Sequence, residues 1–385
     1  MNLDLSPEEQ AFREEVRTWL EENKPKESQP EDGPAMREYD LAWQRKQYAG
    51  GWAGIAWPKE YGGRGLSTSE QLIWYEESAK AGAPLAGSCF VGLNHGGPTL
   101  IANASEAQKT FHLPKILKGE VIWCQGFSEP GAGSDLAGLS TRAEIDGDEL
   151  VVTGSKIWTS YGHIADYQEL LVRTDPTSKK HAGITWVICD MRFPGITIRP
   201  VPFVDRVHHF NQVFYDEVRI PISNVVGEIN GGWKTAMSTL SFERGTAFTE
   251  RQVSLAKAVD NLIDRAKTRT SPDGKLTFGD AEIGRRLTRL RAETAALRAM
   301  TYVAVARNVR RNAPGPDGSM LKILVARLGK ELNQIALELI GSDVVLMNDI
   351  SDGYLRSFAS TVGGGTDEIQ HNIVAQRVLG LPRQQ

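Results

Sequence analysis

The sequence of 385 residues predicts an α+β fold in which a helical region, a β-rich region and a helical bundle follow one another. Amphipathic stretches with helix caps fill residues 1–119, and short β-branched runs fill residues 120–231. Long apolar periods of 3.6 residues fill residues 232–385. We therefore expect an N-terminal α-helical domain, a middle antiparallel β-barrel and a C-terminal four-helix bundle with these bounds, which suits the chain length.

The first region carries local signals for helix starts. In "SPEEQAFREEVRTWLEEN", Ser6 is a candidate N-cap, Pro7 occupies the first helical position and Glu9 completes a capping box. The stretches "STSEQLIWYEESAKAG" and "SEAQKTFHLPKILKG" repeat the pattern of a cap followed by an amphipathic segment. We expect their apolar stripes to serve packing.

The middle region consists of short runs rich in Val, Ile, Thr, Tyr and Trp, which Gly, Pro and Asp separate. These runs are "ELVVTG", "YQELLVRTD", "GITWVICD", "ITIRPV" and "FNQVFYDEVRI". Helix returns after "GGW", over residues 234–269, 280–311 and 319–346, with turn-rich connections "TSPDGKLTFG" and "NAPGPDG".

Composition excludes several classes of protein. The formal net charge is −4 and the pI is about 6.0, which argues against a nucleic-acid binder. The three cysteines Cys89, Cys124 and Cys189 are too scattered for a zinc site or a disulfide framework, and we expect them in the core. The acidic start has no apolar signal core, and no apolar run could span a bilayer. A cytoplasmic location is expected.

The strongest local feature is "CQGFSEPGAGSDLAGLSTRAE", residues 124–144. Its glycines let a ligand approach the backbone, while Ser128 and Ser134 add hydroxyl groups to the N–H donors. A structural turn explains such a loop about as well as a binding loop does. The two interpretations stay open on this stretch alone.

This stretch resembles the first signature of the acyl-CoA dehydrogenase family, flavoproteins that desaturate acyl thioesters between the α and β carbons. "GSKIWTSYGHIADY", "FNQVFYDEVRIPISNVVGEINGGW" and "GGGTDEIQHNIVAQRVLG" resemble further family segments in the same order, so the resemblance covers the whole chain. It implies the family fold, bound FAD, an acyl-CoA substrate and electron-transfer flavoprotein as electron acceptor. It also implies an oligomer, either a homodimer, a homotetramer or an α2β2 heterotetramer.

The resemblance assigns flavin contacts to the loop and the strand after it. Ser128 matches a residue at the flavin pyrimidine edge, Trp158 an indole that packs on the isoalloxazine, and Ser160 a donor near N5 that is usually Thr. Ser134 lies where the family loop meets acyl-CoA. Plain barrel core is the alternative for Trp158. The remaining family positions of this half are Phe127, Gly133 and Thr159.

By the resemblance, the candidate catalytic base lies at a different position in this sequence than in many family members. In "VGGGTDEIQ", Gly364 stands where many members carry the glutamate that removes the α proton, which leaves a backbone N–H to polarise the thioester carbonyl. A minority of the family places the base before an arginine on the first bundle helix, and "TLSFERGTAF" offers Glu243 and Arg244 there. Ala236 and Leu240 give that helix an apolar face, so we expect a raised pKa for Glu243. A glutamate at a bundle edge, paired with an arginine, is the alternative.

The resemblance places the rest of the FAD site on the bundle. Arg269 matches a family arginine, and Gly341 and Thr366 match family positions, whereas Glu338 and Glu368 replace frequent glutamines. A carboxylate at 338 would repel the FAD pyrophosphate unless it turns to a ribose hydroxyl. These departures resemble the branch of α2β2 heterotetramers that act on steroid side-chain thioesters.

Two other functions fit the same pattern. A catalytically silent subunit of a heteromer would explain the changes at the base and glutamine positions, and a flavin oxidase would use the same fold. The pairs His208–His209 and His163–Asp166 have no metal-ligand or triad spacing, so we expect turn or pocket-lining roles and no metal site.

Overall fold

A computed structural model describes residues 5–84, 86–243, 247–270, 274, 276–311, 315–346 and 348–382. The chain divides into two compact units. The β-containing unit comprises Glu21–Ser67 and Ala83–Glu243, and the helical unit comprises Met1–Leu20, Thr68–Gly82 and Arg244–Gln385. Each unit has its own apolar core.

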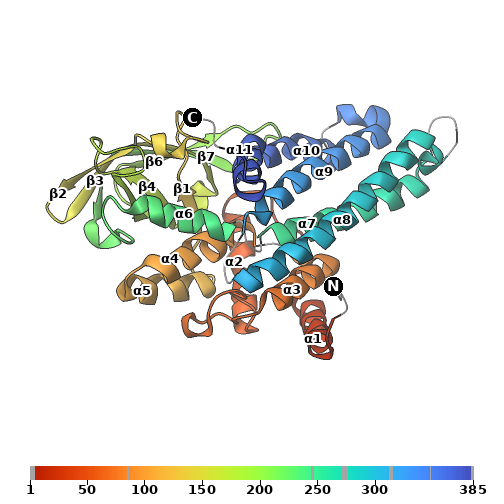
Figure 1. Ribbon diagram of the computed structural model, residues 1–385, viewed down its shortest axis with the longest axis horizontal. Coiled ribbons are helices and arrows are strands. Elements are labelled where there is room, and N and C mark those ends of the chain that lie inside the picture. Colours follow the sequence, from red (N-terminus) through yellow and green to blue (C-terminus); the bar gives the residue numbers. More distant parts are fainter. Residues whose placement is uncertain are drawn as a thin grey trace. The chain divides into compact units, whose positions relative to one another are not determined.

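The seven-stranded sheet of the β-containing unit has the order β1-β4-β2-β3-β7-β6, with β5 also paired to β4 (Figure 1). Its strands are β1 (Trp123–Gly126), β2 (Arg142–Asp146), β3 (Glu149–Ser160), β4 (Tyr167–Arg173), β5 (Ile184–Asp190), β6 (Ile196–Val201) and β7 (Phe210–Pro221). The predicted antiparallel pairing holds for most pairs, but β1 and β2 both run parallel to β4. The loop between β1 and β2 is long enough to carry the chain past β4, which a hairpin turn cannot do.

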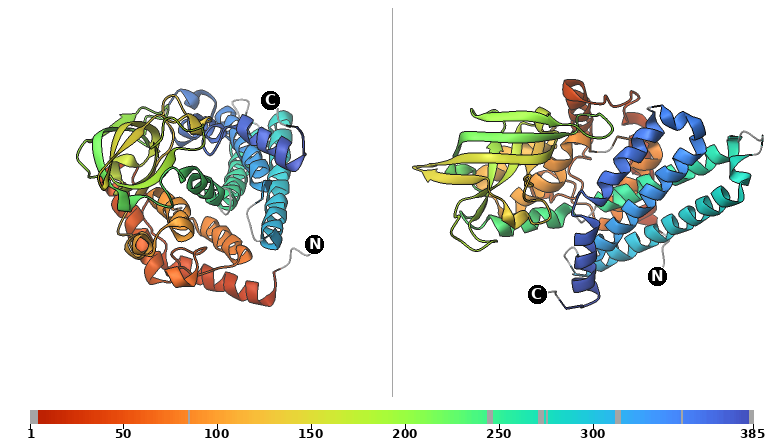
Figure 2. Two further views of the ribbon diagram at one scale, coloured as in Figure 1. Left: turned by 60° about the vertical axis from the view of Figure 1, so that its left-hand side comes forward. Right: turned by 90° about the horizontal axis from the view of Figure 1, so that it is seen from above.

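Alternate residues of the central strands serve two cores. Leu170 and Val187 belong to the cluster formed by the strands themselves, whereas Leu171 and Trp186 belong to the cluster that the helices complete. The strands therefore curl around their own side chains while helices cover one outer face (Figures 1 and 2). Burial on both faces explains why β4 and β5 read as nearly continuous apolar runs.

The helices of this unit are α2 (Gly33–Ala49), α4 (Gly97–Asn103), α5 (Glu106–Leu117) and α6 (Gly232–Glu243). The capping box expected at α5 is present, since Ser105 and Gln108 exchange hydrogen bonds between side chain and backbone N–H. All three cysteines are buried and free, as expected.

The helical unit contains α1 (Pro7–Asn23), whose end lies beyond the unit boundary, and α3 (Thr68–Ala81), α7 (Ala247–Thr268), α8 (Ala281–Arg311), α9 (Asp317–Ile340), α10 (Asp349–Ser357) and α11 (Asp367–Ile373). Ser6 and Glu9 form the predicted capping box. Fully buried residues such as Val259, Leu287 and Ile335 join α7, α8 and α9 in one core (Figure 2).

The periodicity of the first bundle segment predicts one long helix over residues 234–269. Helices α6 and α7 are both present within this range, and residues 244–246 between them lie outside the described part of the chain. The division between the two compact units falls between Glu243 and Arg244. Helix α3 groups with the helical unit although it lies within residues 1–119. No helix among the described residues is both long enough and apolar enough to cross a membrane.

Candidate active site

The loop between β1 and β2 is fastened at its start and open on its surface. The Ser128 carbonyl accepts a hydrogen bond of 2.9 Å from the Ile157 N–H of β3. Ser128 is half-buried, whereas Gly133 and Ser134 are exposed. A Cβ added at Gly131 or Gly133 would meet no atom within 4 Å. The loop therefore presents backbone and hydroxyl groups with free space above them.

A buried ion pair holds this loop to β3. The Lys156 ammonium is fully buried and donates to Glu129 Oε1 at 2.8 Å and to the Phe127 carbonyl at 3.2 Å. Glu129 also accepts hydrogen bonds from the N–H groups of Ser140 and Thr141 at 2.7 and 2.9 Å. Both ends of the loop are thus tied to one carboxylate.

The ion pair keeps its charge at neutral pH. Burial alone would raise the pKa of Glu129, but the charge and hydrogen bond of Lys156 lower it to about 2. Burial lowers the pKa of Lys156 to about 8, against the opposing effect of Glu129. An ionised, multiply hydrogen-bonded carboxylate is a rigid anchor for the loop that carries Ser128.

Trp158 stands on an irregularity of the sheet. The β3–β7 register shifts between Lys156 and Thr159, and Trp158 has a positive φ of 62°. A β-bulge of this kind turns a side chain out of the regular alternation. The indole is 52% exposed and makes an edge contact with Phe210, with ring centroids 5.7 Å apart. The ring is therefore not barrel core, which excludes that alternative.

Of the next two residues, Thr159 is buried within the sheet and Ser160 is partly open to solvent. Thr159 is fully buried, its hydroxyl has no partner among the described residues, and its carbonyl accepts from Asn211 Nδ2 at 3.1 Å. Ser160 is half-buried at the end of β3. The strand thus offers the Ser160 hydroxyl to a ligand, while Asn211 fixes the backbone before it.

Asn211 also belongs to a histidine network in the β-containing unit. Its amide nitrogen lies 3.1 Å from His163 Nδ1, and its amide oxygen lies 2.8 Å from His208 Nε2. His163 Nε2 lies 2.8 Å from Asp32 Oδ1, and the two imidazoles stack at 4.0 Å. Because the amide donates to Nδ1, the His163 proton sits on Nε2 and faces Asp32. Ligand atoms of Asp32, His163 and His208 lie within 4.8 Å of one another, but this protonation occupies the His163 lone-pair position that a cation would need.

The two pairs singled out in the sequence are not the pairs that meet. His163 contacts Asp32 and His208, while Asp166 pairs with Arg37 at 2.8 Å. Asp32 lies 131 residues from His163, so no local spacing could have indicated this contact.

In the helical unit, the glycine run before α11 forms a tight turn. Gly364 and Gly365 have φ values of 69° and 86°, and a Cβ at Gly365 would lie 2.7 Å from Gln370 Nε2. That amide donates to the Gly364 carbonyl at 2.8 Å, while the Gly364 N–H donates to no group among the described residues. The Thr366 hydroxyl accepts from the Ile369 N–H at 3.3 Å and caps α11. The loop offers a free backbone donor and no acid.

Glu338, which replaces a frequent glutamine by the resemblance, forms an ion pair. Its Oε2 lies 2.6 Å from Arg286 Nη1 of α8. Arg269 donates to the Ile340 carbonyl at 3.0 Å, beside Gly341, which has a φ of 61° and ends α9. The guanidinium of Arg286 therefore offsets the charge that would repel a pyrophosphate.

Glu368 is exposed in the first turn of α11. Hydrogen bonds from its own backbone N–H and then from the Thr366 hydroxyl lower its pKa. The neighbouring Asp367 pairs with the buried Lys322 at 2.8 Å, which ties α11 to α9. Glu368 is thus an ionised surface group.

Glu243 is the last residue of α6, and its side chain lies outside the described part of the chain, as does Arg244. The apolar face predicted before it is present, since Ala236 is fully buried and Leu240 packs on the same core. The raised pKa of Glu243 stays a prediction. Sequence reasoning missed Glu250 on α7, where burial raises the pKa to about 7 against the effect of Arg251.

The structure places the predicted residues in three groups. The group in the β-containing unit lies on the loop and on β3, which hydrogen bonds at Phe127 and Ser128 hold together, and it comprises Phe127, Ser128, Gly133, Ser134, Trp158, Thr159 and Ser160. In the helical unit, Arg269, Glu338 and Gly341 lie at the end of α9, whereas Gly364, Thr366 and Glu368 lie at the start of α11, which Asp367 ties to Lys322 near the opposite end of α9. Sequence reasoning missed the anchor Lys156, although a lone lysine in an apolar strand is a signal of a buried pair.

The first group fits a flavin by its own chemistry. A half-exposed indole offers an apolar face to a flat ring, and the glycine loop beside it leaves open space and unhindered donors. The half-buried hydroxyls of Ser128 and Ser160 supply polar contacts for ring edges.

Three family models match the chain in order. They are the acyl-CoA dehydrogenase N-terminal domain over residues 6–120, the middle domain over 124–216 and the C-terminal domain over 230–379. The chain is 39% identical to acyl-CoA dehydrogenase IpdE1 of Mycobacterium tuberculosis, over 97% of this chain and 98% of that protein. It is 31% identical to mitochondrial isovaleryl-CoA dehydrogenase of Pongo abelii, over 62% and 57%.

Solved structures agree with the sequence matches. The ChsE4–ChsE5 complex from Mycobacterium tuberculosis superimposes with a TM-score of 0.84 at 32% identity, with complete coverage of both chains. A steroid ACAD, Tcur3481–Tcur3483, superimposes with a TM-score of 0.86 at the same identity and coverage. The helical, β-sheet and helical regions of this chain are those of the shared fold. The chain therefore belongs to the acyl-CoA dehydrogenase family of flavin-dependent oxidoreductases.

Proposed function

We propose that this chain catalyses the FAD-dependent α,β-dehydrogenation of an acyl-CoA thioester to the trans-2-enoyl-CoA. The observation that carries the proposal is the exposed Trp158 indole, raised on a β-bulge beside the open glycine loop. Strained backbone positions cluster at functional sites, and an exposed indole at such a position offers its face for stacking. A flavin ring is flat and suits this contact.

The chain's own residues divide the remaining work. Glu243 takes the α proton on its carboxylate, with Arg244 beside it in sequence, because the C-terminal loop has glycine where other members have an acid. The free Gly364 N–H polarises the thioester carbonyl and so acidifies the α carbon. Ser134 contacts the acyl-CoA.

When bound, FAD supplies the acceptor for the hydride that leaves the β carbon, and electron-transfer flavoprotein is the proposed next carrier. Ser128, Trp158 and Ser160 orient the ring, with Phe127, Gly133 and Thr159 supporting them. Residues Arg269, Glu338, Gly341, Thr366 and Glu368 are proposed to hold the rest of the cofactor across a subunit interface.

We further propose that the functional unit is an oligomer and that a second chain completes the FAD site. The ChsE4–ChsE5 structure is a complex of two named chains, and the steroid ACAD Tcur3481–Tcur3483 also carries two names. The charged residues Glu338 and Glu368 in place of glutamines favour an α2β2 heterotetramer over a homodimer or homotetramer. A steroid-derived acyl group is the proposed substrate class.

The first test is the visible spectrum of the purified chain, followed by anaerobic addition of acyl-CoAs. Flavin bands that bleach with one thioester would support a self-sufficient dehydrogenase. A colourless chain that gains flavin only with a second subunit would support the heteromer. A protein that binds no flavin in either state would refute the proposal, and oxygen consumption during turnover would indicate an oxidase instead.

The base assignment has its own test. Glu243→Gln should retain flavin and lower turnover by about 10²–10⁴-fold, since a positioned base is removed while the shape is kept. Glu250→Gln is the matched control, because Glu250 is an acid of raised pKa on the following helix. Anaerobic stopped-flow measurement of flavin reduction would compare them. Loss of reduction in Glu250→Gln alone would transfer the role to Glu250.

A further inference from the structure

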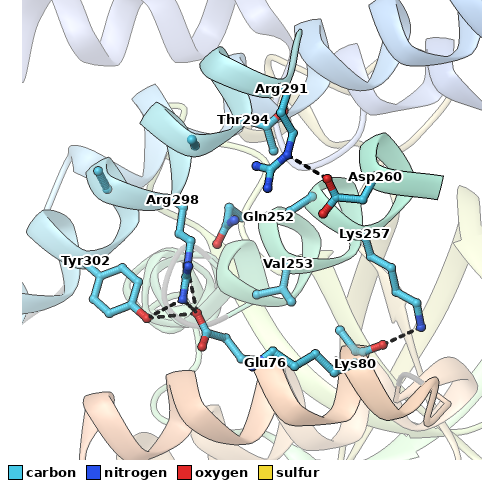
Figure 3. Close-up of a pocket in the computed structure, with 14 residues that line it drawn as sticks. Glu76, Lys80, Gln252, Val253, Lys257, Asp260, Arg291, Thr294, Arg298 and Tyr302 are labelled. Carbon is cyan, nitrogen blue, oxygen red and sulfur yellow. Dashed lines mark hydrogen bonds and ion pairs between the residues drawn. The ribbon is translucent and has the colours of Figure 1, made fainter. Parts of the chain in front are cut away.

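The helical unit contains a cavity of about 770 Å³ lined by α3, α7 and α8 (Figure 3). Its volume lies within the range of about 300–1,000 Å³ typical of small-molecule sites. Small apolar side chains form much of its wall, among them Ala79, Val253, Ala256, Ala295 and Ala299. Among the described residues, none of those assigned to the proposed active site lines it.

Gln252 lies in this wall with its polar atoms unused. The side chain is 1% exposed, and both its amide nitrogen and its amide oxygen lack a hydrogen-bond partner among the described residues. Figure 3 shows the amide among the side chains that line the cavity. A buried amide without partners costs about 1–3 kcal/mol, so such groups are normally satisfied by a ligand, a water or the protein.

The missing partner must both give and take a hydrogen bond. A primary amide has one donating and one accepting end, and a hydroxyl group can serve both at once. A hydrocarbon would satisfy neither end. The position of Gln252 therefore selects an oxygen-bearing ligand, and a hydroxyl is the best match.

Among the described residues, one cationic side chain that lines the cavity has no carboxylate partner. Three other cationic side chains of the wall are paired with carboxylates: Lys80 with Glu77 at 2.7 Å, Arg291 with Asp260 at 2.7 Å and Arg298 with Glu76 at 2.7 Å. Lys257 is exposed and donates to the Ala79 carbonyl at 2.7 Å, and it forms no ion pair within the described part of the chain. An anionic group of a ligand at this position would complete its charge balance.

Both groups line the cavity from α7, at different heights along the helix axis. Lys257 follows Gln252 by five residues on α7, a rise of about 7.5 Å along the axis. Val253 and Ala256 lie between them and line the cavity. A ligand with a carboxylate at one end, an apolar body and a hydroxyl further along matches this order.

We propose that this cavity binds an amphipathic hydroxy acid, with its carboxylate at Lys257 and its hydroxyl at Gln252. The ligand is either a free acid or the acyl portion of a larger molecule, since both carry the same apolar body and hydroxyl. The proposal does not depend on the reaction proposed above, because binding to the cavity can be measured without turnover.

The test uses calorimetric titration of the full-length protein, with any flavin and partner it retains, with decanoate and 10-hydroxydecanoate. These probes differ only in the hydroxyl group. The wild type should bind the hydroxy acid about tenfold more tightly, the effect of one well-made hydrogen bond. Equal affinities, or no binding of either acid, would overturn the proposal.

Three variants locate the effect. Gln252→Met keeps the volume and should abolish the preference for the hydroxyl, whereas Lys257→Met should weaken both acids by a similar factor. Lys267→Met is the control, because Lys267 is an exposed lysine on the same helix that pairs with Asp264. A preference that survives in Gln252→Met would contradict the assignment.

The melting temperature of Gln252→Met shows whether a loss of binding comes from a folding defect. Because Gln252 has no partner, Gln252→Met should melt at the same temperature as wild type or higher. A lower melting temperature would mean that the amide has a structural partner, and would count against the proposal.

A final experiment distinguishes a free hydroxy acid from the acyl portion of a thioester as the ligand. If the acyl portion of the substrate enters the cavity, 10-hydroxydecanoyl-CoA should exceed decanoyl-CoA in kcat/KM and lose that advantage in Gln252→Met. If a free acid is the ligand, 10-hydroxydecanoate should bind without competing with the thioester. A chain that reduces no flavin but binds the hydroxy acid would refute only the proposed reaction.

Discussion

At the scale of single residues, Lys156 and Glu129 hold the loop between β1 and β2 in place. The lysine holds Phe127 and Glu129 from β3, and the carboxylate holds the far end of the loop at Ser140. A buried pair with this many hydrogen bonds is costly to break from one side, because the remaining charge stays buried. The loop geometry thus depends on a contact that touches no ligand.

Replacing one partner of the ion pair should therefore cost more stability than replacing both partners. Lys156→Met should destabilise the β-containing unit by about 3–5 kcal/mol and reduce flavin retention, since Glu129 would be left charged and buried. Urea unfolding and flavin absorbance would measure the two effects. The double variant Lys156→Met with Glu129→Leu should recover part of the stability, and no recovery would argue against the pair as the cause.

At the scale of elements, the bulge in β3 strains the backbone at Trp158 and turns the side chain of that residue out of the sheet. Trp158 adopts a left-handed φ that non-glycine residues avoid, at a place where the register between β3 and β7 shifts. The same irregularity turns the indole out of the sheet. The strained residue and the proposed flavin contact are one and the same, as expected where function overrides local preference.

Two substitutions at this position should differ in their effect on stability. Trp158→Gly should relieve the strain and raise the stability of the flavin-free protein by about 1 kcal/mol, whereas Trp158→Ala should keep the strain and give no such gain. Both should weaken flavin binding, because each removes the ring. Thermal melts of the apoprotein and flavin titration would show this, and tight flavin binding by Trp158→Ala would dismiss the stacking role.

At the scale of the whole molecule, local features were predictable and long-range ones were not. The capping boxes at Ser6 and Ser105 follow from residues three apart. The pairing of Glu338 with Arg286 spans 52 residues, and it required the packing of α9 on α8 to be known. Periodicity placed Gln252 on an amphipathic helix but could not show that its amide meets no partner.

The dependence of global stability on pH follows from two acids with opposite shifts. Glu129 has a lowered pKa of about 2, so its contribution is present above its unfolded pKa of 4.5 and is lost as pH falls toward 2. Glu250 has a raised pKa of about 7, so its contribution is present below 4.5 and is lost as pH rises through 7. Urea unfolding from pH 3 to 8 should show Glu129→Gln flattening the acid limb and Glu250→Gln the neutral limb. Unchanged limbs would show that other groups set the profile.

Burial of the three cysteines should protect their thiols from oxidants. Burial raises the pKa of Cys89 to about 12 and the pKa values of Cys124 and Cys189 well above the usual range. Peroxide and alkylating reagents attack the thiolate, which these residues do not form at neutral pH. Their thiols should stay reduced as long as the β-containing unit stays folded. Modification of these cysteines should therefore report unfolding of the β-containing unit.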